Sequence, residues 1–166
     1  GTFTAAENFT AGTNPRGIVM GDMNGDKKAD VGVVNYNSST LSIFINSGTG
    51  GFAAKVDYTT ETQPAGIAMN DINGDGKPDI AVSNYGGTTA SVFMNNGNGT
   101  FATRVNYTIS GSNPPQVALA DFNGDGKNDL FTAIGNNIEE LYLVVYNRWG
   151  EKIFETTTPG DGWDGT

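Results

Sequence analysis

Three short stretches of this 166-residue chain combine carboxylates, amides and glycine at one repeated spacing. They cover residues 22–30, 71–79 and 121–129, and each has oxygen-bearing side chains at positions 1, 3, 5 and 9 and a glycine at position 4. A calcium ion takes about 6–8 oxygen ligands, and a tight loop with alternating acidic side chains can direct them at one point. The spacing therefore predicts up to three Ca²⁺ sites. Magnesium is less suited to such loops, because it demands stricter octahedral geometry and retains several waters.

Each predicted site uses four side chains and the backbone carbonyl of the lysine at position 7. The candidate ligands are Asp22, Asn24, Asp26, Lys28 and Asp30 in the first loop, Asp71, Asn73, Asp75, Lys77 and Asp79 in the second, and Asp121, Asn123, Asp125, Lys127 and Asp129 in the third. The alternative is that Asp, Asn and Gly form ordinary turns here, but three copies at matched spacing favour calcium. An EF-hand is excluded, because its position 12 is a bidentate glutamate, whereas Val33, Val82 and Thr132 stand there.

The acidity of the chain comes largely from these loops. The formal net charge is −9, and the three loops hold nine of the 18 acidic residues. Three bound Ca²⁺ ions would bring the net charge to about −3, so nucleic acid and anionic membranes are poor partners. No apolar run approaches the roughly 20 residues of a membrane-spanning helix, so membrane insertion is not expected.

Cysteine and histidine are both missing from the sequence. Their absence excludes disulfides, thiol catalysis, Ser-His-Asp chemistry and ordinary zinc sites. No pair of a nucleophile and a base is visible in the remaining residues. We therefore expect that the chain is not an enzyme.

The acidic loops belong to a longer internal repeat. Their first aspartates are 49 and 50 residues apart, and Phe3, Phe52 and Phe101 are spaced by 49 residues. A period of this length is typical of propellers, solenoids and arrays. We expect the chain to begin within one such repeat.

Four short β segments are expected in each repeat. In the first two repeats they cover 18–20, 31–36, 41–45, 52–59, 67–69, 80–85, 91–94 and 101–108. No segment has a sustained helical period, so the predicted fold class is all-β, and a dockerin, which has helices after its loops, does not fit. Four antiparallel strands in about 50 residues describe a propeller blade. The phenylalanines expected in the core between blades are Phe3, Phe44, Phe52, Phe93 and Phe101.

The pattern Asp-x-Asn-Gly-Asp-Gly-Lys-x-Asp, an apolar strand and then the Asn-Asn-Gly-Asn-Gly-Thr-Phe of residues 95–101 resembles the FG-GAP/VCBS repeat. This repeat is the blade of integrin-α-type β-propellers. The resemblance covers roughly residues 1–130 and implies calcium at positions 1, 3, 5 and 9 of each loop. Two full repeats and parts of two more cannot close a ring of six or seven blades. The resemblance therefore implies a partial propeller, completed by a longer parent protein or by association of copies.

The C-terminal stretch departs from the repeat. An apolar strand, a turn at 147–150 and a second strand predict a β-hairpin over residues 141–155. The Asn-Arg-Trp-Gly of residues 147–150 and the Trp-Asp-Gly of 163–165 resemble the gliding-motility C-terminal module of Bacteroidetes proteins, the type B signal read by the type IX secretion system. The resemblance implies a partial Ig-like module that lacks the final strands of the family. We expect blades over 1–120, and a hybrid of the third calcium loop and a truncated sorting module over 121–166.

These observations predict a calcium-stabilised binding or adhesion module, secreted or on the surface of a bacterial cell. The expected partner is an extracellular protein or glycan. One alternative is a structural spacer or filament subunit that assembles through blade edges, with self-association completing a propeller or filament. Another is a non-catalytic part of a polysaccharide-active enzyme. The sequence does not identify the ligand.

Overall fold

The computed structural model describes residues 7–109, 111–120, 129–134, 142–146 and 152–156, and in the strands after residue 128 it describes the backbone and the exposed Lys152. These residues form strands and connecting loops, which confirms the all-β prediction. The strands are β1 (Pro15–Gly21), β2 (Asp30–Asn35), β3 (Thr40–Phe44), β4 (Val56–Thr59), β5 (Pro64–Asn70), β6 (Asp79–Asn84), β7 (Thr89–Phe93), β8 (Val105–Thr108), β9 (Ala118–Ala120), β10 (Asp129–Ile134), β11 (Tyr142–Tyr146) and β12 (Lys152–Thr156).

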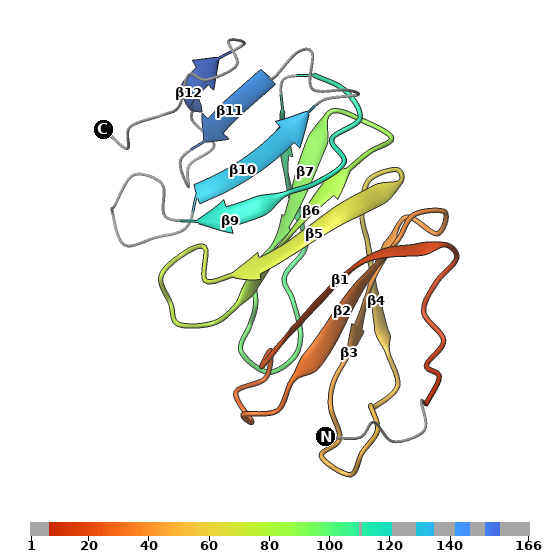
Figure 1. The fold of residues 1–166 in the computed structure, drawn as a ribbon. Coiled ribbons are helices and arrows are strands. Elements are labelled where there is room, and N and C mark those ends of the chain that lie inside the picture. The colour runs from red at the N-terminus through yellow and green to blue at the C-terminus, as the bar shows by residue number, and fades with distance from the viewer. Residues whose placement is uncertain (1–6, 110, 121–128, 135–141, 147–151, 157–166) are drawn as a thin grey trace, which may run out of the picture.

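Each group of four consecutive strands forms one antiparallel sheet in chain order. We call β1–β4 blade 1, β5–β8 blade 2 and β9–β12 the third sheet. The three sheets follow one another across the molecule from red to blue (Figure 1). This is the blade order that the 49-residue period predicts.

The fourth strand of each blade is shorter than predicted. Phe52 forms an isolated bridge with Asn46, and regular pairing resumes only at β4; Phe101 and β8 repeat this arrangement in blade 2. The residues between the bridge and β4 are Ala53, Ala54 and Lys55. None of them is β-branched or aromatic, so they add little strand preference of their own.

The predicted C-terminal hairpin is present as β11 and β12, which pair antiparallel. It does not stand alone, because β11 also pairs with β10, and β10 pairs with β9. The third sheet therefore includes strands on both sides of the division that we expected at residue 121.

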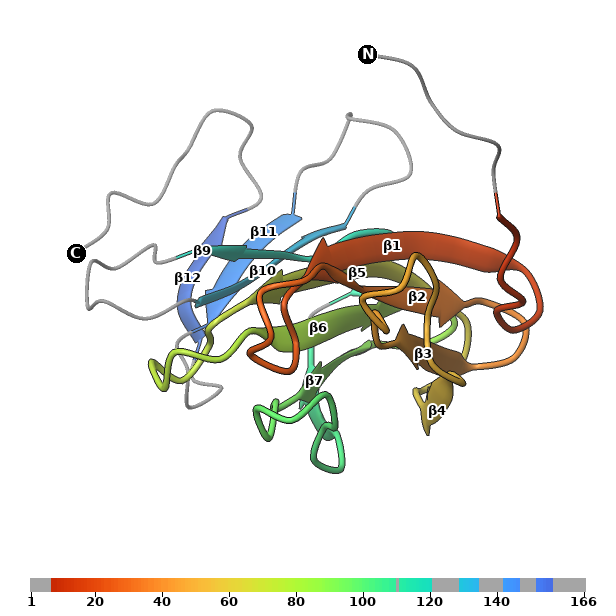
Figure 2. The same cartoon turned by 90° about the horizontal axis from the view of Figure 1, so that it is seen from below.

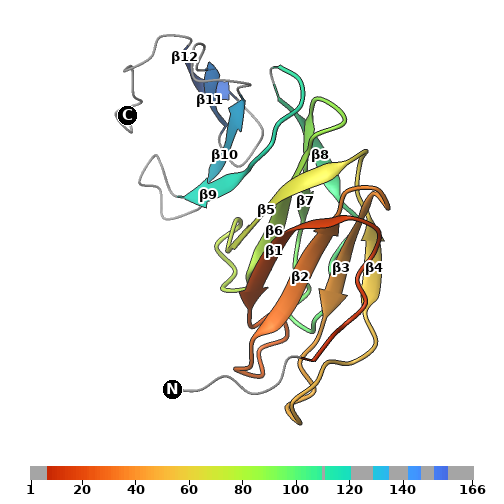
Figure 3. The same cartoon turned by 45° about the vertical axis from the view of Figure 1, so that its right-hand side comes forward.

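The first strands of the three sheets lie side by side, with β5 between β1 and β9 (Figure 2). The sheets fan out from these strands, so that one sheet packs its face on the next (Figure 3). Between blades 1 and 2 lies a core of buried residues: Met23, Val34, Leu41, Ile43, Ile80, Val82, Phe93 and Phe101. A second core on the other face of blade 2 contains Ile72, Ala81, Ala90, Val92, Ile109 and Val117.

The predicted aromatic core between blades is confirmed for Phe93 and Phe101, whereas Phe44 and Phe52 lie outside the core that blades 1 and 2 share. Phe93 and Phe101 are buried between the blades, and Phe44 is also buried. Phe52 is half-buried and contacts Phe44, with 6.1 Å between the ring centroids. Phe3 lies outside the described residues.

Residues 7–14 hold the place next to blade 1 that residues 56–63 hold next to blade 2. The ring of Phe9 packs edge-on against Phe52 at 5.0 Å, as Tyr58 packs against Phe101 at 5.8 Å. The carbonyl oxygen of Asn14 accepts a hydrogen bond from the amide of Tyr36 at 2.9 Å, as Gln63 does from Tyr85. The 49-residue equivalence therefore extends to individual contacts.

Candidate calcium loops and a groove on the opposite rim

The two acidic loops that the structure describes connect the first and second strands of blades 1 and 2, and they lie on the same side of the molecule (Figure 1). We call this side, residues 22–30 and 71–79 with the hairpins 45–51 and 94–100, the acidic rim. The opposite ends of the strands form the opposite rim, with the turns 36–39 and 85–88. Of the third predicted site, Asp121, Asn123, Asp125 and Lys127 lie outside the described residues, and Asp129 is described only as the first residue of β10.

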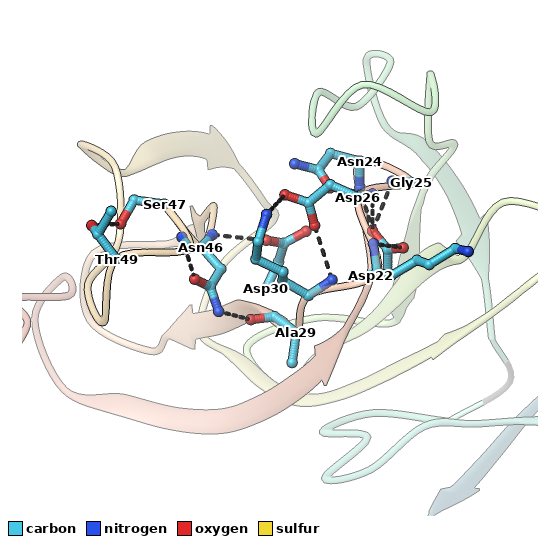
Figure 4. A network of polar contacts seen from close by, with 12 residues as sticks. Asp22, Asn24, Gly25, Asp26, Ala29, Asp30, Asn46, Ser47 and Thr49 are labelled. Carbon is cyan, nitrogen blue, oxygen red and sulfur yellow. Dashed lines mark hydrogen bonds and ion pairs between the residues drawn. The ribbon is translucent and has the colours of Figure 1, made fainter.

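The aspartate at position 1 organises each loop. One oxygen of Asp22 accepts hydrogen bonds from the backbone amides of Gly25 (2.7 Å) and Asp26 (3.1 Å), and the other accepts one from Lys27 (2.7 Å). Asp71 repeats all three bonds with the amides of positions 4, 5 and 6, at 2.8, 3.1 and 2.7 Å. Both loops therefore curl around their first carboxylate, as Figure 4 shows for the first loop.

The side chains at positions 3 and 5 also face the loop backbone. Asn24 and Asn73 accept hydrogen bonds from the amides of the position-5 aspartates, at 3.1 and 2.9 Å. Asp26 accepts one from the amide of Lys28 at 2.9 Å, and Asp75 accepts the equivalent bond at 3.0 Å. The oxygens at positions 1, 3 and 5 are thus turned inward in both loops.

The aspartate at position 9 is fully buried and joins the loop to the neighbouring hairpin. The two oxygens of Asp30 accept hydrogen bonds from the backbone amides of Met23 in the loop and Asn46 in the hairpin, both at 2.8 Å. Those of Asp79 accept the equivalent bonds from Ile72 (3.1 Å) and Asn95 (2.7 Å). The pKa of Asp79 is raised, chiefly by burial and further by the negative charges of Asp75 and Asp71, against the effect of the two amides.

The lysines at position 7 form ion pairs in both loops. The Nζ atom of Lys28 lies 2.9 Å from Asp26, and that of Lys77 lies 3.0 Å from Asp75. The hydrogen bond from the lysine side chain is the main reason that the pKa of each aspartate is lowered. Our prediction used the backbone carbonyls of these lysines, whereas the contacts seen here involve their side chains and amides.

In the arrangement seen within the described residues, no three acidic side chains are grouped as a metal site. The donor chemistry nevertheless fits calcium, because aspartate and asparagine oxygens at positions 1, 3 and 5 face inward and each carboxylate oxygen has a second lone pair. Calcium at these residues would compete with the Lys28 and Lys77 ammonium groups for the Asp26 and Asp75 carboxylates. It would also relieve the repulsion around the buried Asp79 carboxylate.

The opposite rim carries a groove that we did not predict. Its volume is about 310 Å³, and it is lined by Arg16, Gly17, Ile18, Ala65, Ile67, Tyr85, Pro115 and Gln116. The guanidinium of Arg16 lies 3.7 Å from the centre of the Tyr36 ring, and this ring lies 6.1 Å from that of Tyr85. The recurrence of tyrosine at a spacing of 49 residues was the one signal in the sequence that could have indicated this groove.

A second depression on the same rim has a volume of about 390 Å³. Its lining residues are Tyr36, Asn37, Ser39, Thr62, Gln63 and Gly86. Tyr85 lines the groove and Tyr36 lines the second depression. This rim therefore combines aromatic, amide and hydroxyl groups, in contrast to the carboxylates of the acidic rim.

Two solved structures illustrate the fold of this chain. An Agrocybe aegerita lectin, solved for its specific recognition of non-reducing terminal N-acetylglucosamine, matches with a TM-score of 0.56 and 20% sequence identity over 86% of this chain and 38% of the lectin. TcdB2-TccC3 without its hypervariable C-terminal region matches with a TM-score of 0.51 and 20% identity over 76% of this chain. The chain spans only 6% of that structure, and at this identity both matches show the fold alone.

A search of curated proteins found no match. Family models, in contrast, match both parts of the chain. Residues 117–166 match the CHU_C type IX secretion signal domain, which indicates a secreted or cell-surface protein of Bacteroidetes. The described residues contain no helix long and apolar enough to span a membrane.

The FG-GAP-like repeat matches over residues 22–82 and again over 71–132, in register with the two blades and their acidic loops. Both matched families are non-catalytic in kind. Because the two repeat matches together cover more than half of the sequence, the chain belongs to the family of FG-GAP-like repeat proteins.

Proposed function

We propose that this secreted or cell-surface protein is a calcium-stabilised binding module whose ligand is an extracellular protein or glycan. The observation that carries the proposal is that two acidic loops, 49 residues apart, repeat the same inward arrangement of Asp and Asn oxygens on one rim. The opposite rim is thereby left to contact a ligand.

Calcium would stabilise the contact between blades as well as the loops themselves. Met23, at position 2 of the first loop, is buried in the core between blades 1 and 2. Its carbonyl oxygen accepts hydrogen bonds from the Asn95 side chain (3.0 Å) and the Gly99 amide (3.2 Å), both in the hairpin of blade 2. A cation that orders the first loop therefore also orders the surface on which blade 2 packs.

The proposal is tested by thermal unfolding of the full chain in excess calcium, in magnesium and in EDTA. A site that is saturated 100-fold above its dissociation constant stabilises the folded state by about 2.7 kcal/mol. In a chain of this size that corresponds to a rise in Tm of roughly 5–10 °C per site. We expect this rise with calcium and a much smaller one with magnesium.

The matched variants are Asp71→Asn with Asp75→Asn, which remove two proposed ligand charges, and Asp57→Asn with Glu61→Gln, which remove two acidic charges outside the loops. Only the first pair should reduce the response to calcium. Equal melting temperatures in calcium and EDTA would contradict the calcium part of the proposal. Retention on arrays of glycans and extracellular proteins without turnover would support binding over a role in an enzyme.

A specific observation also favours the structural alternative, in which copies assemble through their blades. On the free face of blade 1, Ile18 and Met20 have exposed fractions of 61% and 68%. Their equivalents 49 residues later, Ile67 and Met69, pack against the core between the blades. The free face of blade 1 thus has the same composition as a face that is covered by a blade in this molecule.

A further inference from the structure

The groove on the opposite rim is formed by equivalent positions of three consecutive sheets. Gly17, Gly66 and Gln116 occupy one such position, and Arg16, Ala65 and Pro115 occupy the position before it. The two glycines allow close packing, since a Cβ on Gly17 would lie 2.9 Å from the Ala65 carbonyl oxygen. The other four residues at these two positions are small or apolar. Arg16 and Gln116 therefore supply the charged group and the polar group of the groove.

Arg16 is exposed, and within the described residues it makes no ion pair with a carboxylate. The other cations of the described chain are mostly paired, namely Lys28, Lys55, Lys77 and Arg104. The Tyr36 ring supports the guanidinium by a cation–π contact at 3.7 Å. The groove therefore contains a positioned positive charge and, among its lining residues, no acidic one.

A planar guanidinium binds a carboxylate with two parallel hydrogen bonds, which gives both strength and orientation. The Gln116 amide can donate to and accept from hydroxyl groups. Tyr85 adds ring surface and a hydroxyl, and Ile18, Ile67 and Pro115 add apolar surface. This lining fits a small ring-shaped ligand that carries one carboxylate and several hydroxyls.

We propose that this groove binds a carboxylate-bearing sugar of the uronic acid class. The inference rests on the proposed binding function and names the ligand class for it. The volume of about 310 Å³ lies at the lower end of small-ligand sites and suits one or two sugar rings. The net charge is −9 without calcium and about −3 with three Ca²⁺ ions bound, so the chain repels polyanions in both states. The ligand is therefore a short or terminal uronate. An acidic peptide would satisfy Arg16 but leave the amide and hydroxyl groups of the groove without the matching hydroxyls of a sugar.

The test is calorimetric titration of the full chain, in calcium, with a galacturonate trisaccharide and with the same trisaccharide after reduction of its carboxylates to alcohols. The variant is Arg16→Gln. The matched control is Lys55→Gln, which removes one positive charge that lies outside both the groove and the acidic loops. Melting curves of both variants verify folding, and a glutamate-rich peptide is titrated in parallel.

We expect the acidic trisaccharide to bind, and the neutral one to bind at least about tenfold more weakly, since a hydrogen-bonded charge contributes that much. Arg16→Gln should lose about tenfold in affinity, while Lys55→Gln should stay within about twofold. Equal affinity for both sugars, binding unaffected by Arg16→Gln, or preference for the peptide would each overturn the assignment. If arrays show other ligands that bind independently of Arg16, the binding function stands and only this groove is refuted. If no ligand of any class binds, both are refuted.

Discussion

At the scale of single residues, Gly66 determines how closely blade 2 and the third sheet approach each other. A Cβ atom on Gly66 would lie 2.7 Å from the Cα of Gln116 and 3.0 Å from the carbonyl oxygen of Pro115. Both neighbours are backbone atoms and cannot rotate away. Because Gly66 has no side chain, the chain leading into β9 can pack closely against β5.

We predict that Gly66→Ala destabilises the fold by about 1–3 kcal/mol, because the backbone must shift to accept the extra methyl group. Gly51→Ala is the control, since a Cβ there meets no atom within 4 Å, and it should change stability by less than about 0.5 kcal/mol. Chemical denaturation of both variants measures the difference. Equal stability of the two variants would show that the contact at β5 is not tight.

At the scale of elements, the linker between β4 and β5 is tied to blade 2 by Arg104. Its guanidinium donates to the Glu61 carboxylate at 2.6 Å and to the Thr59 carbonyl oxygen at 3.1 Å. The Asn106 side chain also donates to Glu61 at 2.7 Å. Arg104 and then Asn106 lower the pKa of Glu61 below its usual 4.5. Both partners are partly exposed, so the pair contributes little at high salt.

Because the folded pKa of Glu61 is lowered, its contribution to stability is complete above pH 4.5 and is lost as the pH falls through the lower, folded value. We predict that Glu61→Gln costs about 0.5 kcal/mol at pH 7, and that this cost shrinks steadily as the pH falls below about 4.5. Glu7→Gln, at an exposed position, is the control. A cost of Glu61→Gln that is the same at pH 7 and pH 3 would mean that the charge on Glu61 is unimportant.

At the scale of the whole molecule, the two faces of blade 1 have different environments. One face packs against blade 2, and the other carries the exposed Ile18 and Met20. Val31 and Val33 lie on the same face of blade 1 as Ile18 and Met20. Their equivalents in blade 2, Ile80 and Val82, are fully buried against blade 1. Because the two faces are equivalent, we expect another FG-GAP-like blade to fit the free face of blade 1. A second copy of the chain can supply such a blade.

We predict that the chain associates in a concentration-dependent way through this face. Sedimentation velocity over about 1–100 μM, a range in which weak interfaces respond to concentration, should show the mean mass rising. Ile18→Lys with Met20→Glu should abolish the rise. The control is Val56→Lys with Val105→Glu, the same exchange at apolar positions that are exposed in both blades, at 48% and 51%. A monomer at all concentrations would contradict this interface.

Much of the fold could be predicted from local pattern and period. The 49-residue repeat indicated the blades, and the apolar segments located β2, β3, β6 and β7 closely. The hairpin at β11 and β12 was predicted as well. The pairing of this hairpin with β10, which in turn pairs with β9, was not predicted, because the chain after Asp129 departs from the repeat that located the other strands.

The sequence by itself located the acidic loops and determined that their oxygens share one short turn, because ligands within nine residues are held together by the local backbone. The tertiary structure decided that Asp30 and Asp79 are buried against the hairpins. It also decided that Arg16, Tyr85 and Gln116 line one groove. These three residues lie up to 100 positions apart in the chain, and only the packing of blade 1, blade 2 and the chain leading into β9 brings them together.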